Sequence, residues 1–169
     1  MNFDWMAFLD LARELGDGPT EAHQRSAISR AYYSAFHHAA ACLVKHGVVR
    51  SGVFGHDSVW SSFRLPDDRE RRHIYEWGFN LKDLRHAADY EPRFHHSRII
   101  EREAERAIVR AAQINEMLDR IWDAPWPNNA VNIETEAQQL RLLVRQLSPR
   151  QISSVLAFAQ RLQSPPADI

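Results

Sequence analysis

Apolar residues recur at intervals of three and four along nearly the whole chain, and no stretch shows the sustained alternation of a half-buried strand. This spacing predicts amphipathic helices at about 5–15, 20–47, 57–63, 67–91 and 94–122, separated by short segments that contain glycine or proline. Short connections make successive long helices antiparallel neighbours. We therefore predict an all-α protein built as an antiparallel bundle of four to five helices.

Residues at the expected helix ends are of the types that such ends prefer. Thr20 is a suitable cap for the second helix, and Gly47 suits the left-handed conformation that ends one. Asp67 followed by Glu70 has the pattern of a capping box. The second helix is rich in alanine, which lets neighbouring helices approach closely, so we expect it to be the central element.

The composition changes after residue 122, which we take as the end of the helical bundle of residues 1–122. Residues 123–132 are rich in proline and asparagine and are predicted to form a linker. Residues 133–163 carry two further apolar stripes, the second beginning after Ser148 and Pro149, and predict a C-terminal helical hairpin. A hairpin of this size cannot bury both stripes by itself, so we expect it to pack on the bundle or on another chain.

Composition excludes several classes of protein. The net charge of −1 gives no strong overall field toward nucleic acid. No apolar run approaches the roughly 20 residues that span a membrane, and the N-terminus lacks a signal-peptide pattern, so we expect no membrane association and a cytoplasmic location. The single cysteine, Cys42, excludes internal disulfides. Adjacent histidines, at 37–38 and 95–96, point in different directions on a helix, so we expect no metal site and no cofactor.

Two segments carry a family resemblance. Residues 25–40, which include Ser-Arg-Ala-Tyr-Tyr-Ser-Ala-Phe-His-His-Ala, are similar to the second-helix signature of the HEPN family of nucleic-acid-associated helical domains. Residues 84–90, Leu-Arg-His-Ala-Ala-Asp-Tyr, resemble a stretch of the small bacterial HEPN proteins of the toxin and nucleotidyltransferase-associated type. His56, after a glycine-rich segment, also fits this family. The resemblance covers about residues 3–122 and implies a HEPN-like bundle.

The resemblance also implies an activity. Many HEPN proteins are metal-independent ribonucleases that carry an arginine, four to six residues, then a histidine, and that form the site across a dimer. The arginine neutralises a phosphate, the imidazole moves a proton near neutral pH, and the ribose 2′-OH attacks the neighbouring phosphorus. About three such pairs are expected by chance in a chain of this composition, so the spacing alone does not identify the site.

Two pairs have this spacing, Arg30 with His37 and Arg50 with His56. The arginine that aligns best with the family's catalytic arginine is instead Arg85. At that position the expected histidine is absent, and Asp89 and Tyr90 occupy its place.

The candidate site residues follow from helix geometry. Arg30, Tyr33, Ser34 and His37 should share one face of the second helix, because seven residues are close to two turns. The four candidates from residues 85–90 are expected opposite them. The predicted catalytic residues are Arg85, His86, Asp89, Tyr90, Arg30 and His37, and the predicted RNA-binding residues are Arg30, Tyr33, His56 and Arg93.

Each candidate group has a structural alternative. Arg30, Asp89 and the tyrosines are equally suited to form a buried network that only ties the bundle together. The arginines that recur every fourth residue from 98 to 110 would suit a phosphate-tracking stripe. Because Glu101, Glu103 and Glu105 interleave with them, a solvated salt-bridged face is the favoured interpretation.

The functional hypothesis is a HEPN-type protein of a toxin–antitoxin or defence context that cleaves RNA as a homodimer. A first alternative is a non-catalytic binding module partnered with a nucleotidyltransferase, in which Tyr90 accepts a nucleotidyl group. A second is an oligomerising structural protein in which the hairpin exchanges between chains. The expected partners are accordingly RNA, an antitoxin or nucleotidyltransferase, and a second copy of the chain.

Overall fold

The computed structural model describes residues 4–49, 55–65, 67–92, 94 and 99–127. The chain divides into two units, residues 1–132 and residues 133–169, and all described residues belong to the first. The predicted hairpin at 133–163 and residues 128–132 of the predicted linker therefore lie outside the described residues.

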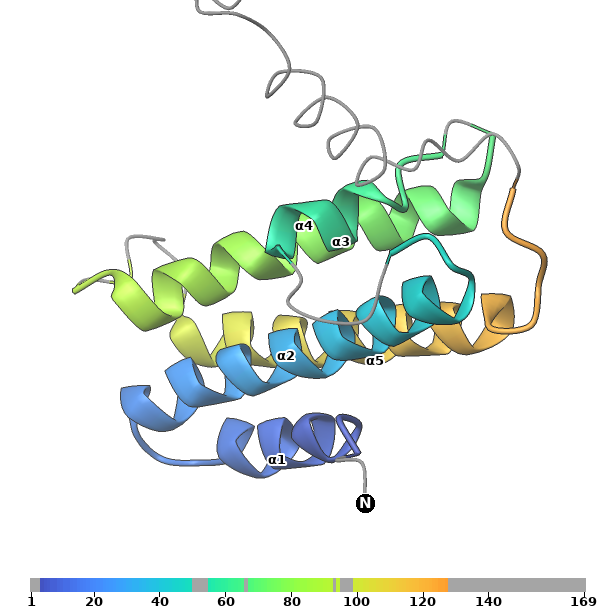
Figure 1. Cartoon of the computed structure of the whole chain (residues 1–169). Helices are drawn as coiled ribbons and strands as arrows, with labels where there is room; N and C mark the ends of the chain where they lie inside the picture. Colours follow the sequence, from blue (N-terminus) through green and yellow to red (C-terminus); the bar gives the residue numbers. More distant parts are fainter. Residues whose placement is uncertain (1–3, 50–54, 66, 93, 95–98, 128–169) are drawn as a thin grey trace, which may run out of the picture. The chain divides into compact units, whose positions relative to one another are not determined.

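Every regular element in the described part of the chain is a helix. The helices are α1 (Ala7–Gly16), α2 (Glu21–Lys45), α3 (His56–Ser61), α4 (Arg69–Tyr90) and α5 (Ile100–Ile121). The four long helices alternate in direction along the chain, and the short α3 connects α2 to α4 (Figure 1). The predicted all-α bundle is confirmed.

Small side chains allow α2 to lie at the centre of this bundle. It contacts each of the other four described helices, and α5 passes behind it in the same direction (Figure 1). Alanines of both helices are no more than 1% exposed: Ala27, Ala31, Ala35 and Ala39 on α2, and Ala104, Ala107 and Ala111 on α5. Small side chains bring the two helix axes close together, as the sequence predicted for the second helix.

Two helix ends match the sequence and two differ from it. Thr20 caps α2 by accepting a hydrogen bond from the backbone of His23, and Gly47 adopts a left-handed φ of 69° beyond its end. The cap of α4 is Asp68 rather than the predicted Asp67. The fifth helix begins at Ile100, later than the predicted start near residue 94.

The shift of the α4 cap has a physical cause. One carboxylate oxygen of Asp68 accepts a hydrogen bond of 2.9 Å from the backbone N–H of Arg71. The other oxygen pairs with the guanidinium of Arg71. Arg71 is only 5% exposed, so its charge needs this partner. One aspartate thus caps the helix and neutralises a buried cation.

A glycine fixes the position of α3 against α4. A Cβ at Gly78 would lie 2.2 Å from the ring of Trp60, which is fully buried. Only a residue without a side chain lets the Trp60 indole approach the backbone of α4 this closely. This contact sets the place of His56, the first residue of α3.

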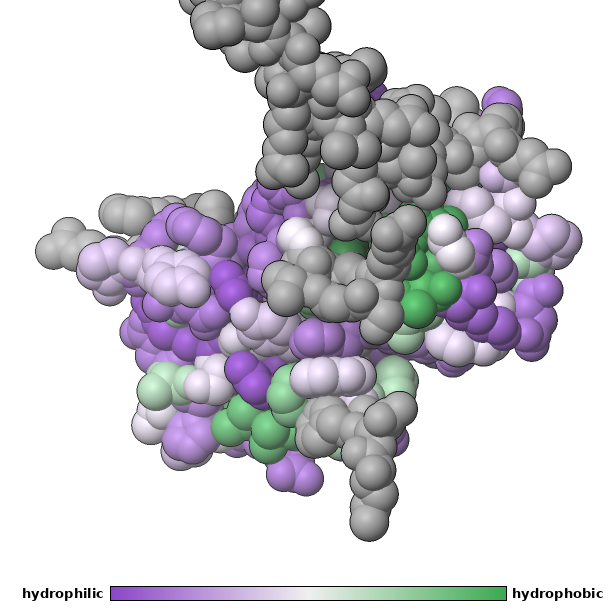
Figure 2. Space-filling view, in the orientation of Figure 1, coloured by the Kyte–Doolittle hydropathy of each residue, from purple (hydrophilic) through white to green (hydrophobic). Residues whose placement is uncertain are grey.

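Residues 123–127, the first half of the predicted linker, pack on the bundle. Trp126 lies edge-on to Phe63 at a centroid separation of 5.5 Å and 4.7 Å from the guanidinium of Arg71. On the face shown in Figure 2, much of the described surface is hydrophilic, with smaller hydrophobic areas over α1 and near the C-terminal end of α2. Leu11 of that helix is 39% exposed.

Candidate functional site

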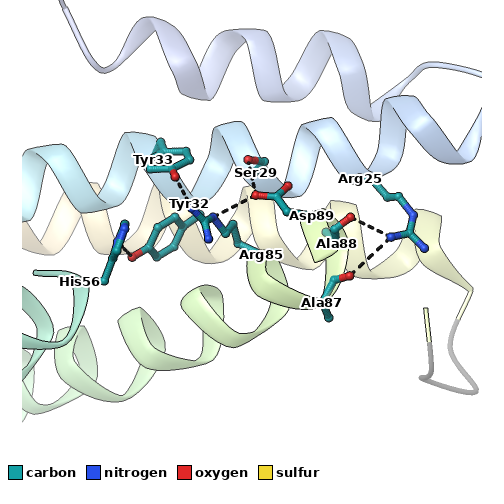
Figure 3. A network of polar contacts seen from close by, with 9 residues as sticks. All are labelled: Arg25, Ser29, Tyr32, Tyr33, His56, Arg85, Ala87, Ala88 and Asp89. Atoms are coloured by element: carbon teal, nitrogen blue, oxygen red, sulfur yellow. Dashed lines mark hydrogen bonds and ion pairs between the residues drawn. The ribbon is translucent and has the colours of Figure 1, made fainter. Parts of the chain in front are cut away.

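The guanidinium of Arg85 is the centre of a polar network between α2 and α4 (Figure 3). It donates to the hydroxyl of Tyr33 on α2, and its Nε lies 3.1 Å from a carboxylate oxygen of Asp89, one turn further along α4. The Arg85 side chain is only 13% exposed. A planar guanidinium held on two sides in this way has a fixed orientation.

The end of α4 is fastened to α2 next to this arginine. Asp89 accepts a long hydrogen bond, 3.4 Å, from the hydroxyl of Ser29. Arg25 donates to the backbone carbonyl of Ala88 at 2.8 Å (Figure 3) and to that of Glu91 at 2.9 Å. These carbonyls have no partner within the helix, and a cation there also complements the helix dipole.

His56 approaches the same place from α3. Its Nδ1 lies 2.6 Å from the hydroxyl of Tyr32, which also accepts a hydrogen bond of 3.3 Å from the indole of Trp60. Lys82 of α4 pairs with Asp57, so a second contact ties α3 to α4 at this point. The imidazole therefore has a fixed position near Arg85.

His37 completes the group on α2. Its ring lies 5.9 Å from that of Tyr33, and Trp5 stacks on it with a centroid separation of 3.5 Å. We call Tyr33, His37, His56, Arg85 and Asp89 the Arg85 cluster.

The two histidines of the cluster favour the neutral form. Burial lowers the pKa of His56 below its ordinary value, and the positive charges of Arg85 and Lys82 lower it further, against a smaller opposite effect of Asp57. Burial also lowers the pKa of His37, with a contribution from His56. Both imidazoles are consequently available as proton acceptors at neutral pH.

Tyr32 supports this arrangement and stays protonated. Burial raises the pKa of its hydroxyl far above the ordinary value of a phenol, although Trp60 and Arg85 oppose this effect. Neither Tyr32 nor Trp60 was predicted to belong to the site. The sequence offers only a weak signal for them, a double tyrosine in the matched motif and an aromatic residue four positions after His56.

The structure brings some predicted residues together and separates others. The Arg85 cluster brings together five of the predicted residues: Tyr33, His37, His56, Arg85 and Asp89. Arg30 lies beside it, with its guanidinium 5.4 Å from the Tyr33 ring and 4.6 Å from the Phe8 ring. The structural alternative placed Arg30 and Asp89 in one network, but Asp89 pairs with Arg85.

Ser34 and His86 point elsewhere. Ser34 is buried and accepts from the Asn115 amide of α5 at 3.1 Å, so it does not share the face of Tyr33. His86 is exposed and lines an open hollow of about 420 Å³ between α4 and α5, together with residues that include Asp83 and Arg110. Consecutive residues on a helix diverge by about 100°, which separates His86 from Arg85.

Tyr90 lies between these two regions. Its ring is 5.5 Å from the Arg85 guanidinium and 5.1 Å from the His86 ring, and the residue is 63% exposed. Arg93 lies outside the described residues. On the α5 face, Arg106 pairs with Glu103 at 2.9 Å, one of the pairs that the sequence suggested.

In the part of the chain that the structure describes, no three histidine, cysteine, aspartate or glutamate side chains gather where they could hold a metal ion. Within the same residues, no helix has the length and apolar character needed to span a bilayer.

The fold and the cluster define a class of protein, an all-helical bundle with an arginine, tyrosine and histidine site at the junction of its second and fourth helices. The family model of the HEPN domain matches residues 7–121, more than half of the chain. The chain therefore belongs to the HEPN family. No curated protein and no solved structure gives a significant match to it. HEPN domains have nuclease, RNA-related or toxin–antitoxin roles and often form homodimers.

The lowered pKa values of the two histidines predict how stability depends on pH. The unfolded chain takes up protons on these residues near pH 6.5, while the folded chain resists protonation to a lower pH. Their contribution to stability is thus complete above about pH 6.5 and is lost as the pH falls toward the folded pKa values. The free energy of unfolding, measured by urea denaturation, should fall between about pH 7.5 and about pH 5.5. It should fall less when both histidines are replaced by glutamine.

Tyr33→Phe is the matched control, because it disturbs the same cluster without removing an imidazole. It should keep a pH dependence close to that of the unmodified protein. Equal pH dependence in the unmodified protein and in the double histidine variant would contradict the assignment.

Proposed function

We propose that this protein is a metal-independent RNA endonuclease of a toxin–antitoxin or defence system, acting as a homodimer in the cytoplasm. One observation carries the proposal. The Arg85 guanidinium is held next to a tyrosine hydroxyl and near two imidazoles that favour the neutral form, and these groups come from three different helices.

In this proposal Arg85 binds the scissile phosphate. Asp89 and Tyr33 set the plane of its guanidinium, and a guanidinium in a fixed plane suits two oxygens of a phosphate. Arg30, whose guanidinium lies 5.4 Å from the centroid of the Tyr33 ring, supplies a second positive charge for a neighbouring phosphate. Binding an anion here would also offset the unfavourable burial of the arginine charge.

His56 is the proposed general base. In the tautomer that donates Nδ1–H to Tyr32, its Nε2 is free to accept the proton of a ribose 2′-OH. The 2′-oxygen forms a bond to phosphorus as the bond from phosphorus to the 5′-oxygen breaks, and the 5′-oxygen takes a proton from water. The products are a 2′,3′-cyclic phosphate and a 5′-hydroxyl. The nucleophile is the 2′-OH of the RNA itself, and the proposed steps use no metal.

This site departs from the family pattern in where its histidines come from. The position that the family's motif would give to a histidine holds Asp89 and Tyr90. In the proposal, His56 from α3 performs the role of the missing residue. A second copy of the chain would bring a second Arg85 cluster toward the same RNA.

Arg85→Ala tests the proposal. The purified protein is expected to cleave single-stranded RNA in the presence of EDTA, and the variant should be slower by about a hundred- to a thousandfold, the usual loss for one charge-stabilising donor. The measurement is the initial rate of cleavage of an end-labelled RNA. The same strand made of DNA should stay intact, because it has no 2′-OH.

Arg13→Ala provides the matched control. Arg13 is also an arginine paired with an aspartate on its own helix, but its side chain is 53% exposed and lies on α1. Its removal should leave the rate unchanged. The proposal fails if the unmodified protein does not cut RNA with EDTA present, or if both arginine variants retain the same activity.

A second candidate function rests on the exposure of Tyr90. This tyrosine is 63% exposed, and the adjacent guanidinium of Arg85 could stabilise a phosphate on its hydroxyl. In the alternative role, the chain is a binding module modified by a nucleotidyltransferase. The Tyr90 oxygen would attack the α-phosphorus of a nucleoside triphosphate, with loss of its proton to solvent and departure of pyrophosphate.

Intact-protein mass spectrometry distinguishes this candidate. After co-expression with a nucleotidyltransferase, the chain should gain the mass of a nucleoside monophosphate, and Tyr90→Phe should not. Tyr75→Phe, on an earlier turn of α4, is the control and should be modified normally. An unmodified chain, or equal modification of Tyr90→Phe, would rule out this role.

A further inference from the structure

A second group of polar atoms lies near the start of α4, around the ring of Trp126. The Arg71 guanidinium is 4.7 Å from the centroid of this ring, and the His46 ring is 5.3 Å from it. We call these three residues the Trp126 donor group. A rise of about 1.5 Å per residue places Arg71 roughly 21 Å from Arg85 along the helix axis. The group is therefore separate from the Arg85 cluster.

Several nitrogens of this group are buried and lack a hydrogen bond. Among the described residues, Nε and Nη2 of Arg71, Nε1 of Trp126 and Nε2 of His46 have no partner. Arg71 is only 5% exposed, and Asp68 pairs with its Nη1 alone. A buried N–H without an acceptor is unfavourable. The gathering of such atoms around one ring therefore indicates a binding site for an acceptor.

The chemistry of these donors favours an anion with several oxygens. The two unpaired nitrogens of Arg71 form one edge of the guanidinium, and such an edge matches two oxygens on one carbon or phosphorus atom. The Trp126 indole can only donate and adds a third hydrogen bond. Water fits this set poorly, because it must also donate its own hydrogens. Apart from the His46 ring nitrogen, none of the unpaired side-chain atoms in the group can accept one.

We propose that the Trp126 donor group binds a small oxyanion, a phosphate or a carboxylate. The Arg71 edge holds two of its oxygens, the Trp126 indole donates to one of them, and His46 donates in the tautomer with hydrogen on Nε2. The bound anion links the end of α2, the first turn of α4 and residues 123–127. Trp126 lies beyond residues 7–121, so the site extends past the part of the chain that matches the HEPN domain.

The charges beside the group predict which anions bind. Asp68 already pairs with Arg71, and Asp123 with Lys45, so there is little net positive charge to attract an anion of any kind. Binding depends instead on fixed N–H groups. An anion with two oxygens on one atom can use both nitrogens of the Arg71 edge, whereas a spherical chloride ion cannot match them in the same way. Trp126 and His46 are half-buried, so the group lies at the border of the core.

Nuclear magnetic resonance of the tryptophan indole N–H groups tests the site in the full chain. The Trp126 signal is assigned through the contact of its ring with Phe63. Titration with sodium phosphate or with sodium acetate should shift this signal to saturation, and the lower dissociation constant identifies the preferred class of oxyanion. Sodium chloride at the same ionic strength should leave the signal nearly in place. Arg85→Ala should keep the response, because the Arg85 cluster takes no part in it.

Trp126→Phe removes one donor and keeps a ring beside Arg71. In this variant the ring signals of His46 report binding, and the dissociation constant should rise about ten- to a hundredfold, the loss expected for one hydrogen bond to a charged group. Trp122→Phe is the matched control. Trp122 contacts Lys45 and His38 and not the donor group, so its replacement should leave the dissociation constant unchanged.

The proposal is overturned if neither oxyanion moves the Trp126 signal, which would mean that ordered water alone binds there. It is also overturned if chloride moves the signal equally, or if Trp122→Phe weakens binding as much as Trp126→Phe. The titration of the unmodified protein decides the matter even if Trp126→Phe is poorly folded. Because none of these measurements involves RNA, their outcome is independent of the cleavage assay.

Discussion

The burial of the Arg85 charge is the constraint on which the junction of three helices depends. A guanidinium that is only 13% exposed is unfavourable unless it is paired and hydrogen-bonded, and α4 alone supplies only Asp89. The Tyr33 hydroxyl on α2 provides the second partner, so α2 and α4 must lie close together at this point. Trp60 against Gly78 then brings α3, with His56, to the same place.

The cluster has properties that a purely structural network would not need. Two histidines with lowered pKa values weaken the fold as the pH falls, since the unfolded chain accepts protons more readily. Perturbed imidazoles beside a fixed guanidinium are common at functional sites, where stability is sacrificed for chemistry. Tyr90 is 63% exposed and adds aromatic surface beside Arg85. The structural alternative explains the Arg85–Asp89 pair, and the proposed function gives the histidines and the exposed Tyr90 a role as well.

Much of this architecture could be predicted from residue spacing. Helical periodicity gave the elements, and the alanines of α2 correctly indicated the central helix, because both are properties of single helices. The cap of α4 is Asp68 and not the predicted Asp67, because Asp68 also pairs with the buried Arg71. The burial of Arg71 cannot be read from the local sequence. The spacing rule also grouped Ser34 with Tyr33. The two residues are adjacent in sequence and therefore point in different directions, and Ser34 faces the interior and Asn115. Contacts between elements, such as Trp5 on His37 or Tyr32 with His56, have no local signal in the sequence.

The central claim is that the Arg85 guanidinium is an anion-binding group and not only a tie between helices. Nuclear magnetic resonance of the arginine Nε–H groups tests it most directly, during titration with a single-stranded DNA that cannot be cleaved. The Arg85 signal, assigned by its loss in Arg85→Lys, should shift and saturate together with the ring signals of His56. An Arg85 signal that stays fixed while those of exposed arginines such as Arg13 move would contradict the claim.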